Sequence, residues 1–275
     1  MEWHRIKTII IAILLVINGF LLVLVGARRS EALRYEQSAL DGSIQVLARN
    51  GISLDPQVIS GSAGQQAAST ERSLPLEQAL AATLLGEPVE GVDRGGGLYT
   101  YATDLGQISI RSGGELTVYL ADLPHWYTAD PETHAAELMG SVDIEHQRIA
   151  YDVLGGTGRI TYRQLLDGVP MFSGQITFVY EEGRLAEMFG NLLLAEKITV
   201  ENSSVLSLPT VLMGFLDDVL TSGDVCSAIL EVEPGYLMTQ SFASNIRLRP
   251  VWYISTNTAD YYVDGISGEL TRITE

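Results

Sequence analysis

The feature that most limits how this chain can fold is an apolar run near its N-terminus. Residues 8–27 contain no ionisable side chain, and basic residues stand on both sides of them. A helix of that length rises about 30 Å, which matches the hydrocarbon core of a bilayer. Residues 1–29 are therefore predicted to form a short N-terminal tail and a single transmembrane anchor, with residues 8–27 in the lipid bilayer.

Two other interpretations of the run stay open. A cleaved signal peptide needs a small residue before the cut, which Val25 or Ala27 could supply, but its apolar core is usually shorter. A buried helix of a globular domain would need a polar face, which this run lacks. The Lys and Arg residues near the run do not favour a cytoplasmic N-terminus, so the flanking charge alone does not decide the orientation.

Charge and cysteine content exclude several classes of protein. The chain has 34 acidic and 17 basic residues, a formal net charge of −17, so nucleic acid and anionic lipid headgroups would repel it. Cys226 is the only cysteine, which excludes an internal disulfide and a CxxC motif. Its apolar neighbours indicate a buried structural thiol.

Hydrophobic periodicity and turn residues predict an α+β fold: one transmembrane helix followed by two helix-plus-antiparallel-sheet units. The predicted segments are a juxtamembrane helix (30–51), a first α+β unit (52–124), a linking segment (125–150) and a second α+β unit (151–275). Leu40, Ile44 and Leu47 form an apolar stripe on the juxtamembrane helix, which packs on its own domain or pairs with a partner's helix.

Local signals mark the ends of the expected elements. Helices are expected after Ser73, from Pro131, and from Ser204 or Ser207 to Gly223. Residues 60–73 are small and polar and indicate a flexible loop. Tight turns are expected at 167–168 and 182–183.

No catalytic motif is found. His125, His134 and His146 are spaced by nine and twelve residues, which matches no metal-binding pattern. The sequence LGGTGRI (154–160) lacks the Lys-Ser/Thr of a phosphate-binding loop and is predicted to be a turn. We therefore expect no catalytic residue, no cofactor and no metal, and a protein that is not an enzyme.

Several motifs resemble known families. The N-terminus, with Trp3, a basic pair and Asn18 within the apolar run, resembles the start of the YycH/YycI family of regulatory membrane proteins, as does LARNGISLD. The closing sequence YVDGISGE (262–269) is similar to the last hairpin of PepSY-type modules. The segment QLLDGVPMF (164–172) resembles a strand pair of propeptide-like domains.

The YycH/YycI resemblance implies a single-pass protein of the cell membrane with a cytoplasmic N-terminal tail and an extracellular C-terminal domain. Such a protein would bind a sensor histidine kinase and a YycH-like companion. It would modulate a two-component system that controls cell-wall metabolism. The PepSY-like hairpin implies an alternative, a propeptide-like inhibitory or chaperone module that acts on an envelope or secreted peptidase.

Two groups of residues are candidates for specific roles. Asn18 is costly in hydrocarbon unless it bonds to another helix, and Gly19 permits close approach, so both are predicted to contact a membrane partner. Asp264, Gly265 and Gly268 are predicted to form a structural turn, in which the glycines supply positive φ.

Overall fold

A computed structural model describes residues 2–61, 65–142, 144–240 and 245–274; the other positions, including 62–64 of the expected loop, lie outside the description. Within the first helix, side chains are described only at residue 7, at 14–15, at 17–24 and from 34 onward. The helices are α1 (Glu2–Arg49), α2 (Leu74–Leu85), α3 (Pro131–Ser141) and α4 (Leu208–Ser222), with short 3₁₀ turns at Pro56–Val58 and Pro124–Trp126.

The helix ends follow the local signals in the sequence. Ser73 caps α2 by accepting a hydrogen bond from the Leu76 N–H, and α3 begins at Pro131 behind Asp130. Gly223 ends α4 in the left-handed conformation with φ +74°. These predicted ends are confirmed, because each depends on neighbours only a few residues away.

Over the described residues, fifteen strands join in one hydrogen-bonded network. They are β1 (Ser53–Leu54), β2 (Ala68–Glu71), β3 (Val92–Asp93), β4 (Leu98–Thr103), β5 (Gly106–Arg111), β6 (Glu115–Leu120), β7 (His146–Leu154), β8 (Thr157–Leu166), β9 (Val169–Glu181), β10 (Arg184–Asn191), β11 (Ile198–Val200), β12 (Ala228–Gln240), β13 (Asn245–Thr256), β14 (Asp260–Asp264) and β15 (Leu270–Arg272). The main strand order is β11-β2-β13-β12-β9-β10-β6-β5-β4-β3.

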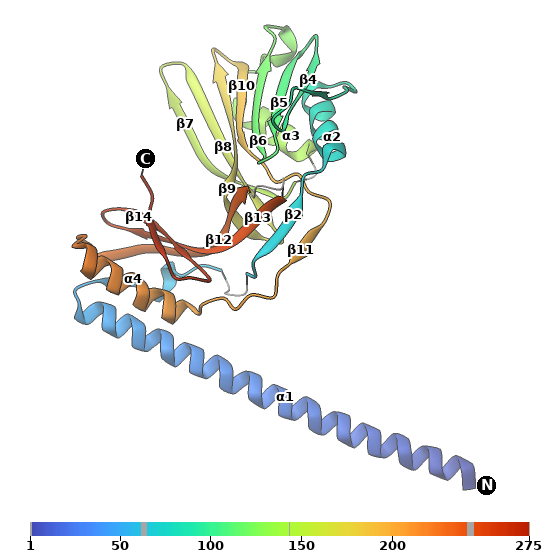
Figure 1. Cartoon of the computed structure of the whole chain (residues 1–275), viewed down its shortest axis with the longest axis vertical. Coiled ribbons are helices and arrows are strands. Elements are labelled where there is room, and N and C mark those ends of the chain that lie inside the picture. The colour runs from blue at the N-terminus through green and yellow to red at the C-terminus, as the bar shows by residue number, and fades with distance from the viewer. Residues whose placement is uncertain (1, 62–64, 143, 241–244, 275) are drawn as a thin grey trace.

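One long strand, β9, connects the two halves of this network (Figure 1). Near its start, Met171 pairs with Tyr236 of β12 in parallel. Farther along, β9 pairs antiparallel with β8 and β10. Gly235 lies at the junction, where an added Cβ would stand 2.6 Å from the Pro170 carbonyl oxygen. The absence of a side chain there lets the two strands approach.

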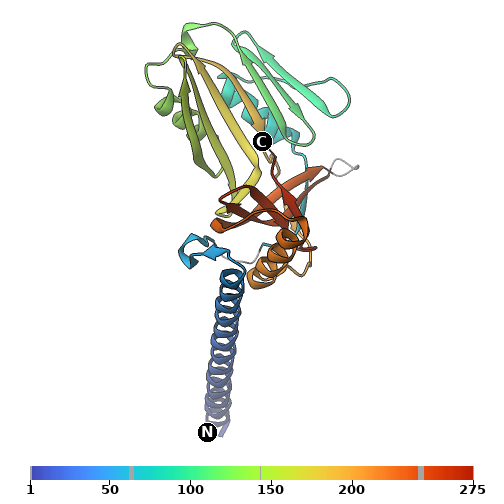
Figure 2. The same cartoon turned by 90° about the vertical axis from the view of Figure 1, so that its left-hand side faces the viewer.

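Two large apolar clusters stabilise the two halves. One gathers residues of α2, α3 and strands β4–β6 and β8–β10 around Trp126 and Phe178. The other gathers the end of α1, α4 and strands β12–β14 around Phe215 and Trp252. Leu47 of α1 is fully buried in this second cluster, so the stripe on this helix packs on its own chain. Figure 2 shows the N-terminal part of α1 projecting away from both halves.

The predicted membrane anchor is wrong. Among the residues whose side chains the structure describes, no helix is both long enough and apolar enough to cross a membrane. From Arg34 onward α1 carries charged and polar side chains. The predicted location, a single-pass protein with an extracellular domain, is contradicted by the same finding.

The predicted fold class also needs correction in its arrangement. The fold is a mixture of helices and strands, but its strands do not divide into two antiparallel sheets. They form a single large network that includes the parallel pairs β1–β12 and β9–β12. The physical reason is the length of β9, whose thirteen residues are enough to pair with both halves.

Candidate functional site

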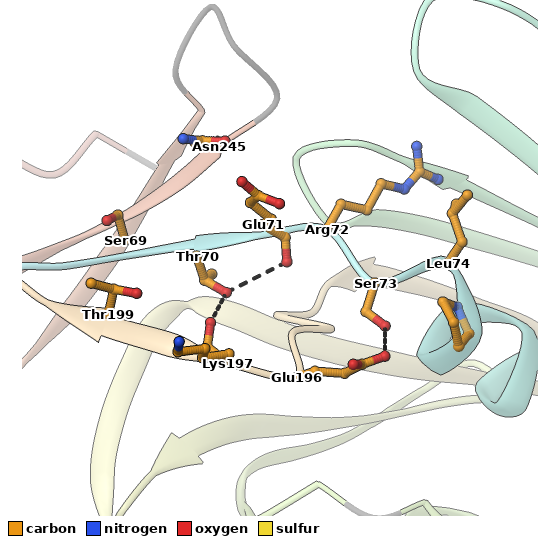
Figure 3. Close-up of a pocket in the computed structure, with 11 residues that line it drawn as sticks. Ser69, Thr70, Glu71, Arg72, Ser73, Leu74, Glu196, Lys197, Thr199 and Asn245 are labelled. Atoms are coloured by element: carbon orange, nitrogen blue, oxygen red, sulfur yellow. Dashed lines mark hydrogen bonds between the residues drawn. The ribbon is translucent and has the colours of Figure 1, made fainter.

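A cavity lies where β2 leads into α2, beside β11 and the start of β13 (Figure 3). It has a volume of about 670 Å³. Its lining residues are mostly polar: Ser69, Thr70, Glu71, Arg72, Ser73, Leu74, Pro75, Glu196, Lys197, Thr199 and Asn245.

Hydrogen bonds across the cavity hold its walls together. The Thr70 hydroxyl donates to the Lys197 carbonyl oxygen at 2.6 Å, and the Ser73 hydroxyl donates to Glu196 Oε1 at 2.8 Å (Figure 3). The residues that line the cavity include no histidine and no cysteine. The hydroxyls of Thr70 and Ser73 are occupied in these structural contacts, and the other polar side chains of the cavity can bind polar groups.

A buried ion pair lies beside this cavity, because Arg72, one of the lining residues, pairs with Glu77 of α2. The Arg72 guanidinium donates to both oxygens of Glu77, and it also donates to the carbonyl oxygens of Gly97 (2.6 Å) and Ile110 (3.1 Å). The Tyr101 hydroxyl donates to Glu77 Oε2 at 3.3 Å. Burial, and then the negative charge of Glu77, raise the pKa of Tyr101 to about 12. This cluster fixes the start of α2 against β4 and β5.

A second candidate is the edge strand β7, which pairs only with β8 among the described strands (Figure 1). It is nine residues long, and large apolar side chains are exposed along it. The exposed fractions are 45% for Tyr151, 65% for Val153 and 84% for Leu154. Long apolar edge strands are rare in proteins that do not use them, because they attract other strands.

The hairpin geometry indicates which backbone groups of β7 are free. Gly155 and Gly156 form the two-residue turn between β7 and β8, so Leu154 and Thr157 form the pair that closes the hairpin. Hydrogen-bonded and non-hydrogen-bonded pairs alternate from there, which directs the backbone groups of Tyr151 and Val153 away from β8. These groups can pair with an added strand.

The sequence contained a signal for β7 but not for its role. Tyr151, Asp152 and Val153 alternate between apolar and polar side chains, which is typical of a strand. Strands were expected only from Tyr151, whereas β7 begins at His146. Nothing in the local pattern shows that this strand lacks a second neighbour, because pairing is decided by distant residues.

The predicted turn residues lie between β14 and β15. Asp264 Oδ1 accepts hydrogen bonds from the N–H groups of Ile266 (2.9 Å) and Ser267 (2.8 Å). Gly268 has φ +77°, whereas the φ of Gly265 is outside the left-handed region. An added Cβ at Gly265 would stand 2.9 Å from the Pro250 carbonyl oxygen. The glycine at 265 is therefore required by close packing and not by positive φ.

The other candidates lie apart from these features. Asn18 and Gly19 are exposed on α1, with no atom within 4 Å of a Cβ built on Gly19, and a partner contact there stays a prediction. His134 Nδ1 lies 3.0 Å from the Tyr180 hydroxyl, and His146 Nδ1 lies 2.8 Å from the Ile144 carbonyl oxygen. Within the described part of the chain, no group of three residues is placed to hold a metal ion.

Comparison with known proteins gives a likeness in fold alone. No protein-family model matches the chain, and no curated protein matches it, so the expected membership of the YycH/YycI family has no support there. An uncharacterized protein from Eubacterium rectale is 11% identical, with a TM-score of 0.48 over 76% of this chain and 86% of that chain. The YpeB C-terminal domain from Bacillus megaterium is 10% identical, with a TM-score of 0.39 over 75% of this chain and all of that chain.

Proposed function

We propose that this chain is a binding module of the propeptide type, which is not an enzyme and which takes an extended segment of a peptidase along β7. The observation that carries the proposal is the open edge of β7, where Tyr151, Val153 and Leu154 are exposed beside free backbone groups. In strand addition the backbone hydrogen bonds provide affinity, and alternate side chains provide specificity. The resemblance of residues 164–172 and 262–269 to propeptide-like and PepSY-type modules supports this choice of partner.

The proposal differs from the first expectation from sequence, a regulator of a sensor histidine kinase with a YycH-like companion. That expectation depended largely on a membrane anchor. A kinase partner stays a prediction, and the same experiment separates the two classes of partner.

A photo-crosslinking amino acid at Leu154 tests the proposal in cells that produce the full chain. We expect a crosslinked peptidase from position 154 and none from position 92, because Val92 is also exposed but lies on β3 at another edge of the network. Val153→Pro should abolish the product, since proline removes a free N–H donor, whereas Val153→Thr should retain it. Equal products from 154 and 92, or no product from either, would refute binding at β7. A kinase at position 154 would replace the peptidase as the partner.

A further inference from the structure

The surroundings of β7 constrain the chemistry of the segment that it binds, if the proposed function is right. A cavity of about 440 Å³ lies between α3 and β7. It is lined by Asp130, Glu132, Thr133, Ala136, Glu137 and Arg148. Three of these residues are acidic and one is basic, so the cavity has an excess of negative charge.

The partners of these charges differ. Asp130 caps α3, and hydrogen bonds from the side chain and the N–H of Thr133 lower the pKa of its carboxyl group, which keeps it ionised. Glu132 forms an ion pair with Arg148. Glu137 is exposed and forms no ion pair with any residue that the structure describes. Glu137 is therefore the carboxylate in this cavity that is most available to a ligand.

Strand pairing shows that the cavity and the apolar edge share one face of the sheet. Arg148 and Tyr151 of β7 stand opposite Tyr162 and Ile160 of β8, which are both buried in the cluster that α3 covers. Val153 lies on the same face, opposite Gly158. Every second side chain of a strand added to β7 would point to this face. These side chains would meet α3 at one end and Tyr151 and Val153 at the other.

We infer that the segment bound by β7 carries a lysine or arginine that enters the cavity beside α3 and pairs with Glu137. At positions two and four residues away, on the same face, it carries apolar side chains that cover Tyr151 and Val153. The complementary charge gives the segment its register along β7, because a shift by one residue turns the basic side chain to the other face.

A flexible segment fits this edge better than a second copy of the chain. The β7–β8 pairing shifts register between Arg148 and Ala150, which interrupts the regular spacing of the free edge. An extended peptide can adapt to this irregularity, whereas a second, rigid β7 cannot. Two copies would also repel each other, because each has a formal net charge of −17.

Peptide selection with the full chain tests the inference. A displayed library of random nonapeptides is selected on the wild-type chain and depleted on Val153→Pro. We expect the retained peptides to carry Lys or Arg with apolar residues at the second and fourth positions from it. Their affinity should fall about fivefold in Glu137→Lys and less in Glu137→Gln. N-methylation of alternate residues in one such peptide should abolish binding, and this control leaves the protein unchanged.

The outcomes separate the two proposals. Retained peptides with no basic preference, or with unchanged affinity for Glu137→Lys, would overturn the inference but leave strand addition intact. The proposed function would be overturned if no retained peptide needed the free edge of β7 and if N-methylation weakened the binding of none of them. A dimer in sedimentation that Val153→Pro abolishes would show that a second copy occupies the edge, which also overturns the inference.

Discussion

Replacement of Glu77 by leucine should destabilise the half of the protein that contains α2 by about 3–5 kcal/mol, because it leaves a buried positive charge without its partner. Only 2% of the Glu77 side chain and 12% of the Arg72 side chain are exposed. Without Glu77, Arg72 keeps its hydrogen bonds to the carbonyl oxygens of Gly97 and Ile110, but these carry no full charge. The Tyr101 hydroxyl loses its acceptor as well.

Hydrogen exchange measured by mass spectrometry gives the loss of stability separately for each segment of the chain, including α2. Peptides from α2 should exchange at least a hundredfold faster in Glu77→Leu, since each 1.36 kcal/mol corresponds to about tenfold. The double variant Arg72→Met, Glu77→Leu should recover most of the loss, because two apolar side chains replace both charges. As a control, the exposed pair Arg111–Glu115 should contribute less than about 1 kcal/mol. If the single and the double variants exchanged alike, the argument from an uncompensated charge would be wrong.

Three further predictions concern stability. The raised pKa of Tyr101 contributes stability that is complete below the ordinary phenol pKa near 10 and is lost as the pH rises through about 12. The free energy of unfolding in urea should therefore fall over this pH range in the wild-type protein, and it should fall less in Tyr101→Phe. Gly235→Ala should lower the thermal midpoint by overpacking worth about 1–3 kcal/mol, whereas Gly214→Ala, in open space on α4, should raise it. Ser73→Ala should cost about 1 kcal/mol in urea unfolding, and Ser207→Ala much less, because Ser207 makes no side-chain cap hydrogen bond to α4.

The features that could be predicted from sequence are those set by near neighbours. Asp167 and Gly168 have φ of +50° and +77°, and Glu182 and Gly183 have φ of +51° and +81°, as the expected two-residue turns require. The helix caps belong to the same class. In each case the residue's own conformational preference, or a hydrogen bond within one turn, decides the structure.

Features that depend on distant residues could not be predicted. Residues 68–71 lie in a segment expected to be a loop, yet they form β2. The sequence ASTE has little preference for a strand, but β11 and β13 pair with it on both sides and bury Thr70. The open edge of β7 is the complementary case, since a strand's sequence does not show whether a neighbour will reach it.

The turn after β14 contains the glycines predicted from sequence, but Gly265 is required by close packing and not by the expected positive φ. Two variants distinguish these two causes. Asparagine adopts positive φ more readily than most residues do, so Gly268→Asn should cost no more than about 1 kcal/mol in thermal unfolding, with the flexible Leu206 side chain moving aside. Gly265→Ala should cost about 1–3 kcal/mol although its φ suits alanine, because the new methyl group would meet the backbone of Pro250. If Gly265→Ala were neutral, close packing would not explain the glycine at 265.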